Sequence, residues 1–245
     1  MGNRGQNLAM TEPKSTYHWL LFDADGTLFD YDRAEAKALE GTFREFTLPF
    51  EPGHAGVYQK INQQIWLDFE NGQITAEALR VVRFERLFAA IQVRPGSAAF
   101  AEEFSSRYLH NLAMASDLTN GAENIVRALR ARYHLALITN GLKDVQRPRL
   151  AHSTISDCFE AVAISEEMGV AKPDPRYFTA VFEMIGWPER KNVVVIGDSL
   201  TSDIQGGINY GLDTCWYNPN GKTADLKLLP TYQIQKLEEL ETLLL

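Results

Sequence analysis

The chain has 245 residues, 45% of them hydrophobic, and a formal net charge of -8 at pH 7. This length and hydrophobic content suffice to bury a sizeable core, in one large domain or two smaller ones. The acidic balance argues against non-specific binding of nucleic acid, which needs basic surface, and no apolar run reaches the roughly 18 residues that would indicate a membrane span.

The N-terminal residues 1–14 are polar and lack the apolar core of a signal peptide. We predict a disordered tail there and a cytoplasmic protein. The two cysteines, Cys158 and Cys215, lie far apart in apolar segments. This placement indicates buried free thiols in a reducing compartment.

The first predicted strand ends in two carboxylates. Residues 19–22 are apolar and run directly into Asp23 and Asp25. An ionised carboxylate in a buried strand is costly unless a metal ion or another positive group meets it. Alternate residues of an extended chain point to the same side, so one carboxylate could attack a substrate while the other moves protons. A calcium loop would need more oxygen ligands nearby than the following residues supply.

The segment after this strand is helical in pattern. Val57, Ile61, Ile65 and Phe69 recur every four residues, which marks one apolar face of a helix, and Thr75 is a predicted N-cap. Helices are predicted over 33–46, 55–70, 76–91 and 96–112.

This helical segment is too long for a simple crossover between strands, which uses about 30 residues. We therefore expect an inserted helical domain at 33–112, and a core domain formed by 15–32 and 113–245.

Three later apolar strands are also followed by polar residues. Residues 135–138 lead to Thr139 and Asn140, residues 161–164 precede a loop with Lys172, and residues 192–196 lead to Asp198, Ser199 and Asp203. Apolar runs that alternate with helices indicate a parallel sheet buried on both faces. Ligands of such sheets bind beyond the carboxyl ends of the strands.

Helices are predicted between and after these strands, together with a fifth strand over 214–217. The predicted helices are 122–129, 142–150, which Pro148 should kink or end, and 177–185. No G-x-G-x-x-G follows any strand, so a dinucleotide-binding fold is disfavoured.

The four polar segments resemble, in order, the four motifs of the haloacid dehalogenase (HAD) superfamily of phosphohydrolases, over about residues 17–218. The resemblance implies an α/β fold with a Rossmann-like parallel-sheet core and an inserted all-helical cap of the subfamily I type. It also implies a phosphatase that forms an aspartyl phosphate on Asp23, with Asp25 as general acid and base.

The same resemblance implies how phosphate is held. Thr139 and the amide of Asn140 would bind phosphoryl oxygens. Lys172 would neutralise the charge of the phosphate and of the nucleophile, as phosphoryl transfer to a carboxylate requires.

A magnesium site is implied as well, which Mn²⁺ could also occupy. Its ligands would be Asp23, the main-chain carbonyl of Asp25, and Asp198, in keeping with the preference of Mg²⁺ for oxygen. Asp203 and Ser199 would support this site without binding the metal. Asp203 would orient Lys172 or a metal-bound water. Taken singly, the polar residues after the strands could instead be helix caps or turn residues.

The predicted cap resembles the pyrimidine 5'-nucleotidase branch of the superfamily, as do residues 165–173 and 211–216. The implied substrate is a nucleoside monophosphate such as UMP, dUMP or TMP. Candidate base contacts are Tyr58, Asn62, Trp66 and Phe69, since an aromatic ring stacks a base for about 1–3 kcal/mol and an amide can hydrogen-bond its edge. Tyr58, Asn62 and Trp66 are spaced by four, which equally allows these three side chains to face the cap core.

Other functions stay open at this stage. A phosphatase or mutase of sugar phosphates or other small phosphate esters could keep all four motifs and differ in the cap. A non-catalytic metal-binding regulatory protein on the same scaffold usually lacks the nucleophile or the lysine, whereas both are present here. A 2-haloacid dehalogenase replaces the second acid, so Asp25 argues against it.

Overall fold

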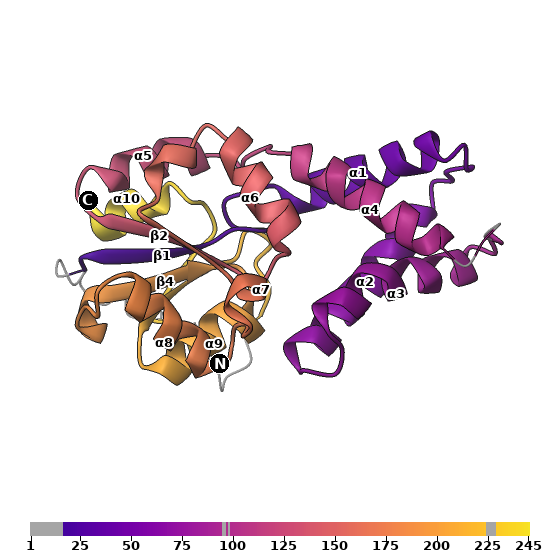
Figure 1. Cartoon of the computed structure of the whole chain (residues 1–245). Coiled ribbons are helices and arrows are strands. Elements are labelled where there is room, and N and C mark those ends of the chain that lie inside the picture. Colours follow the sequence, from indigo (N-terminus) through magenta and orange to yellow (C-terminus); the bar gives the residue numbers. More distant parts are fainter. Residues whose placement is uncertain (1–16, 95–96, 98, 224–228) are drawn as a thin grey trace, which may run out of the picture.

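Six parallel strands form one sheet in the computed structural model, which describes residues 17–94, 97, 99–223 and 229–245. The strand order is β3-β2-β1-β4-β5-β6 (Figure 1). The strands are β1 (Trp19–Asp23), β2 (His134–Thr139), β3 (Ala161–Ile164), β4 (Val193–Gly197), β5 (Asp213–Tyr217) and β6 (Tyr232–Ile234). The predicted N-terminal tail, residues 1–14, lies outside the described residues.

Helices cover both faces of this sheet. They are α5 (Ala122–Arg130), α6 (Lys143–His152), α7 (Ser165–Met168), α8 (Pro175–Met184), α9 (Gln205–Tyr210) and α10 (Glu239–Leu244). Leu20 and Phe22 of β1 belong to the apolar cluster shared with α5 and α10, whereas Leu21 belongs to the cluster shared with α8 and α9, because alternate side chains of a strand point to opposite faces. Burial of both faces explains the continuous apolar strands, and the predicted fold class is confirmed.

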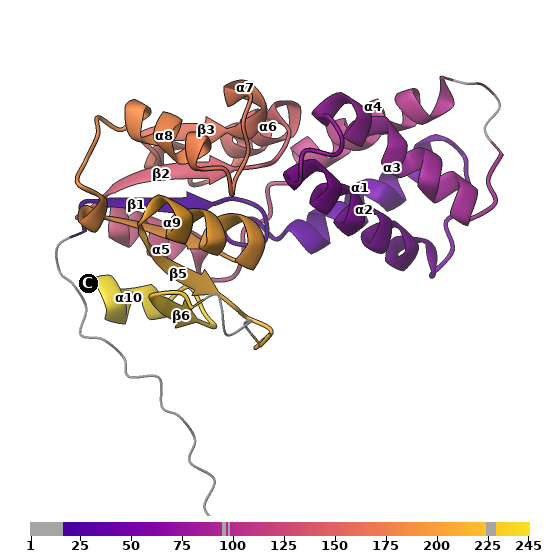
Figure 2. The same cartoon turned by 90° about the horizontal axis from the view of Figure 1, so that it is seen from below.

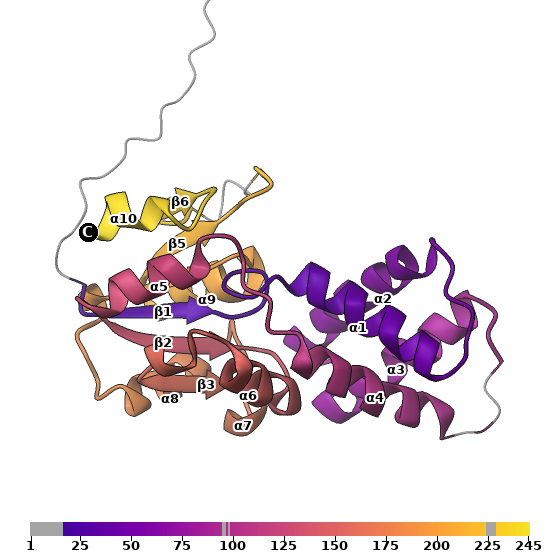
Figure 3. The same ribbon diagram turned by 90° about the horizontal axis from the view of Figure 1, so that it is seen from above.

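The four helices after β1 form a cap with its own apolar core. They are α1 (Tyr31–Glu45), α2 (His54–Glu70), α3 (Ala76–Ala90) and α4 (Phe100–Met114). The cap lies beyond the carboxyl ends of the strands (Figure 2), and α1 and α4, which lead to and from the core, pack side by side (Figure 3). Thr75 caps α3 as predicted, since its side chain accepts a hydrogen bond from the Ala78 amide. The predicted start of the fourth helix at residue 96 lies outside the described residues.

The structure differs from the sequence-based expectations in the second half of the chain. Pro148 does not end α6, which continues to His152, because Val145, Arg149 and Leu150 are buried and hold the helix against its neighbours. β6 and α10 were not predicted. Short helical turns also occur at Ser156–Cys158, Arg190–Asn192 and Leu200–Ile204.

Both cysteines are free and buried, as predicted. Within the part of the chain that the structure describes, no helix combines the length and the apolar character needed to cross a bilayer.

Two glycines let α9 lie close to its neighbours. A Cβ atom on Gly207 would stand 2.5 Å from Thr214 Cγ2 of β5, and one on Gly206 would stand 2.7 Å from the Phe178 ring of α8. Both distances are too short for real contacts, so α9 can pack here only without side chains at these positions.

We expect Gly207→Ala to lower the free energy of unfolding by about 1–3 kcal/mol, because the added methyl group overpacks the contact with β5. Urea denaturation would measure the change. Gly56→Ala is the matched control: Gly56 lies in α2 with no atom within 4 Å of the added Cβ, so this variant should be neutral or slightly stabilising. Equal destabilisation by both variants would contradict the packing argument.

Candidate active site at the carboxyl end of the sheet

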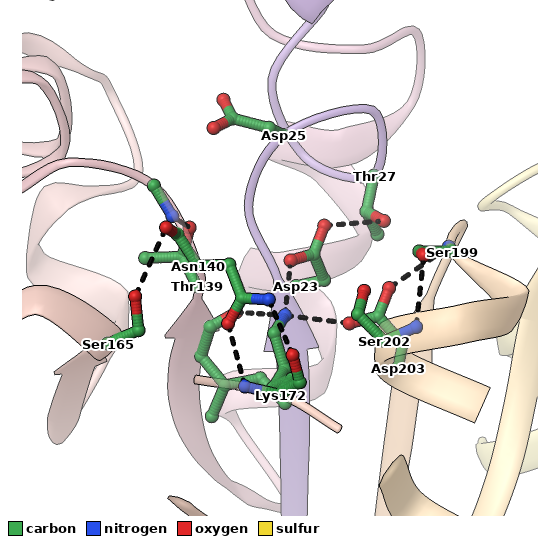
Figure 4. A network of polar contacts seen from close by, with 12 residues as sticks. Asp23, Asp25, Thr27, Thr139, Asn140, Ser165, Lys172, Ser199, Ser202 and Asp203 are labelled. Atoms are coloured by element: carbon green, nitrogen blue, oxygen red, sulfur yellow. Dashed lines mark hydrogen bonds and ion pairs between the residues drawn. The ribbon is translucent and has the colours of Figure 1, made fainter. Parts of the chain in front are cut away.

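A buried lysine joins two carboxylates at the end of β1. The Lys172 ammonium donates hydrogen bonds to Asp23 Oδ1 at 2.7 Å, to Asp203 Oδ1 at 2.7 Å and to the main-chain oxygen of Ile138 at 3.1 Å (Figure 4). Lys172 and Asp203 are 1% and 0% exposed. All three ammonium protons are therefore used inside the protein, and the lysine is fixed in place.

The charges of this group are strongly coupled. Burial alone would lower the pKa of Lys172, but Asp203 and Asp23 outweigh it and raise that pKa, so the ammonium stays charged. Burial and the nearby Asp203 raise the pKa of Asp23 more than Lys172 lowers it. Burial and Asp203 likewise raise the pKa of Asp198 to about 7. The carboxylates here therefore exceed the positive charge that the protein supplies.

The acidic residues could hold a divalent cation. Asp23, Asp198 and Asp203 each offer a carboxylate oxygen, and these oxygens lie within 4.8 Å of one another. Asp203 is already engaged, because its Oδ1 accepts from Lys172 and its Oδ2 accepts from the Ser199 amide at 3.0 Å. Asp23 and Asp198 thus remain as the carboxylates with capacity for a hard cation.

Gly26 allows Asp198 to approach the loop after β1. A Cβ atom on Gly26 would stand 2.7 Å from Asp198 Oδ2, and the backbone of Gly26 has a φ of +83°. Only glycine adopts this conformation without strain and leaves room for the carboxylate.

Asp25 is turned away from Asp23 (Figure 4). Its Oδ2 accepts a hydrogen bond from Gln146 Nε2 at 2.5 Å, and its Oδ1 forms an ion pair with the buried Arg149. The sequence analysis missed both partners. Their positions in the sequence held one signal. Gln146 and Arg149 are adjacent to the apolar residues Val145 and Leu150, which form the buried side of α6.

Arg149 also contacts both ends of the cap. Its guanidinium lies 5.5 Å from the centre of the Phe29 ring, just before α1, and Nη2 donates to the Leu112 main-chain oxygen of α4 at 3.4 Å. A single buried side chain therefore joins Asp25 to the two segments that connect cap and core.

Thr139 and Asn140 stand at the end of β2. Thr139 Oγ1 accepts from the Gly141 amide at 2.9 Å. The Asn140 side chain donates to the Lys172 carbonyl and accepts from the Lys172 amide, both at 2.8 Å. These two bonds clamp the main chain of Lys172, which sequence reasoning did not anticipate. Ser199 supports Asp203 through its main-chain amide, as noted above, and its Oγ accepts from the Ser202 amide at 3.2 Å.

A cavity of about 570 Å³ lies between cap and core. Its core side includes Asp23, Asp25, Thr139, Asn140, Lys172, Asp198, Ser199 and Asp203, and its cap side includes Tyr31, Glu35, Asn62 and Trp66. The structure therefore brings the polar residues that follow the strands to one place, as their positions in the sequence led us to expect.

Of the four predicted base contacts, two line the cavity. Asn62 and Trp66 do so, whereas Tyr58 is fully buried in the cap core, stacked on Phe84 with ring centres 5.4 Å apart. Phe69 packs edge-on against Trp66 at 5.7 Å and is not among the lining residues that the structure describes. α2 turns by about 40° between positions four residues apart, so side chains spaced by four reach different surroundings.

Lys172→Met should lower the free energy of unfolding by about 3–5 kcal/mol, because it leaves Asp23 and Asp203 buried without their cation. Chemical denaturation without divalent metal would measure this change. In the control Lys191→Met, the side chain is 71% exposed and pairs with Glu189, so stability should be nearly unchanged. A similarly small effect of Lys172→Met would show that the buried pairs do not organise the fold.

Comparisons with known proteins agree with this geometry. A family model described as haloacid dehalogenase-like hydrolase matches residues 17–211. Pyrimidine 5'-nucleotidase YjjG of Escherichia coli is 35% identical over 93% of this chain and 98% of that protein. Pyrimidine 5'-nucleotidase PynA of Streptococcus pneumoniae is 35% identical over 91% and 93%. The crystal structure of HAD-hydrolase YfnB from Bacillus subtilis bound to magnesium, 37% identical, has a TM-score of 0.85 over 93% of this chain and 98% of that one.

Proposed function

This chain belongs to the haloacid dehalogenase-like hydrolase family, and we propose that it is a Mg²⁺-dependent phosphatase that removes the 5'-phosphate of pyrimidine nucleoside monophosphates. The observation that carries the proposal is the Asp23–Lys172–Asp203 group, which lines the cavity between core and cap. The relatives YjjG and PynA are pyrimidine 5'-nucleotidases, which supports the choice of substrate.

Asp23 is the proposed nucleophile. Lys172 holds Asp23 Oδ1 at 2.7 Å, while Oδ2 has only the longer hydrogen bond of 3.3 Å from Thr27 Oγ1. The more weakly held oxygen attacks phosphorus, and the bond from phosphorus to the nucleoside 5'-oxygen breaks. The ammonium of Lys172 offsets the repulsion between the carboxylate and the phosphate.

Asp25 is the proposed general acid and base. It gives a proton to the leaving 5'-oxygen, then takes one from the water that hydrolyses the aspartyl phosphate. In the structure it is bound to Gln146 and Arg149. Its carboxyl group must exchange at least part of these contacts for the substrate oxygen before it can transfer a proton.

Asp23, Asp198 and the main-chain carbonyl of Asp25 would hold the metal ion. Asp23 and Asp198, whose pKa values are raised by burial and by the nearby Asp203, offer carboxylate oxygens that fit a hard divalent cation. Bound Mg²⁺ supplies positive charge to the phosphoryl oxygens. Thr139 and the amide of Asn140 complete the phosphate site. Use of Mn²⁺ in place of Mg²⁺ and the cytoplasmic location stay predictions.

Asp23→Asn should abolish phosphate release from UMP without loss of fold, because an amide is a far weaker nucleophile of nearly the same shape. Asp25→Asn should lower kcat by about 10²- to 10⁴-fold. Steady-state phosphate release and circular dichroism would measure both. Asp117→Asn, at a surface ion pair with Lys37, is the control and should retain wild-type turnover. Folded Asp23→Asn protein with near-wild-type activity would falsify this mechanism.

Removal of divalent metal should stop hydrolysis, and added Mg²⁺ or Mn²⁺ should restore it. Asp198→Asn should raise the Mg²⁺ concentration needed for half-maximal activity by at least about tenfold, because it removes a charged ligand. The matched variant Asp157→Asn, at an exposed ion pair with Arg130, should leave the Mg²⁺ titration unchanged. Full activity in excess chelator is the result that contradicts the metal site.

A further inference from the structure

The cap side of the cavity contains a buried polar group, made of Tyr31, Glu35, Asn62 and Arg83. Glu35 is 6% exposed and Asn62 is 3% exposed, and both line the cavity with Tyr31. Arg83 lies behind them, 1% exposed, with its guanidinium 5.0 Å from the ring centres of Phe84 and Tyr108. Sequence reasoning did not identify Glu35.

Asn62 is committed to its neighbours. Its Nδ2 donates to Glu35 Oε1 at 2.7 Å and to the Tyr31 hydroxyl at 3.1 Å, which uses both amide protons. Its Oδ1 receives a long hydrogen bond of 3.5 Å from Arg83. Asn62 therefore orients Glu35, and in this arrangement neither of its amide protons is available to the edge of a base.

Glu35 keeps hydrogen-bonding capacity on the cavity side. A carboxylate has about four acceptor positions, and among the described residues Glu35 accepts hydrogen bonds from Asn62 and Tyr31. Among the described residues no ion pair to Glu35 occurs. The charge of Arg83 acts on Glu35, but the Arg83 side chain hydrogen-bonds to Asn62.

We propose that Glu35 hydrogen-bonds to the N3 edge of the pyrimidine ring, accepting from the N3–H of uracil or thymine when ionised and donating to the unprotonated N3 of cytosine when protonated. The inference rests on the proposed nucleotidase function. Trp66 lines the same cavity beside this group and offers a ring on which a base can stack.

Both protonation states of Glu35 are accessible near neutral pH. Burial raises the pKa of Glu35 to about 7, with Asp32 acting in the same direction, while the hydrogen bonds from Asn62 and Tyr31 and the charge of Arg83 act against it. The titratable and charged groups that face Glu35 are Tyr31 and Asp32 on α1, Tyr58 on α2, Arg83 on α3 and Tyr108 on α4. The tyrosine hydroxyls have raised pKa values and stay neutral in this range.

The test is the ratio of kcat/KM for UMP to kcat/KM for CMP, measured from about pH 6 to about pH 8 at saturating Mg²⁺. The two nucleotides carry the same phosphate, so titration of the phosphate and of the catalytic carboxylates cancels in the ratio. Ionisation of Glu35 favours uracil, so the ratio should rise with pH by about tenfold, the effect expected of one hydrogen bond to a charged group.

Glu35→Gln should make this ratio nearly independent of pH, because an amide both donates and accepts and does not titrate. Glu40→Gln, at an exposed position of the same helix, should keep the wild-type pH dependence. A flat ratio in the wild-type enzyme, or an unchanged slope in folded Glu35→Gln, overturns the inference and leaves the nucleotidase proposal standing. If the enzyme cleaves a hexose phosphate but neither nucleotide, both fail together.

Discussion

The ammonium group of Lys172 is buried between Asp23 and Asp203, so its solvation must come entirely from the protein. That requirement fixes much of the surrounding structure. Asn140 clamps the main chain of Lys172 from the end of β2, the Ser199 amide holds the far oxygen of Asp203 beyond the end of β4, and Asp23 ends β1. A charged group removed from water is tolerated only with such partners. The three neighbouring strand ends must therefore stay in register, and the parallel sheet supplies that register.

The cap also buries a carboxylate, Glu35, but with hydrogen bonds in place of an ion pair. Glu35 is buried with hydrogen-bond donors but has no ion pair among the described residues, whereas Arg149 on the core side is buried against Asp25, Phe29 and the end of α4. The cavity thus lies between the Asp23–Lys172–Asp203 group of the core and the polar group of the cap. In the proposed function, the core residues carry the phosphate chemistry and the cap residues carry the choice of substrate.

The sequence predicted the core better than the cap surface, for a physical reason. β1, β2 and β4 are buried on both faces, so each appears as an unbroken apolar run, and the polar residues that follow these strands could be placed at one edge. Helical periodicity gives the face of a helix but not what covers it, so Tyr58 in the cap core and Trp66 in the cavity could not be told apart. Glu35, Gln146 and Arg149 were missed because polar residues on helices are usually solvated, and only tertiary packing shows these to be buried.

A crystal structure of the enzyme with Mg²⁺ and beryllium fluoride, which mimics a phosphoryl group on a carboxylate, would test the central claim most directly. We predict that the fluoroberyllate lies on a carboxylate oxygen of Asp23, close to the Lys172 ammonium, and that Mg²⁺ binds to Asp23 and Asp198. Lys172 should keep its contact with Asp203 in that complex. Binding of the group away from Asp23, or a lysine that leaves Asp203 and turns to solvent, would contradict it.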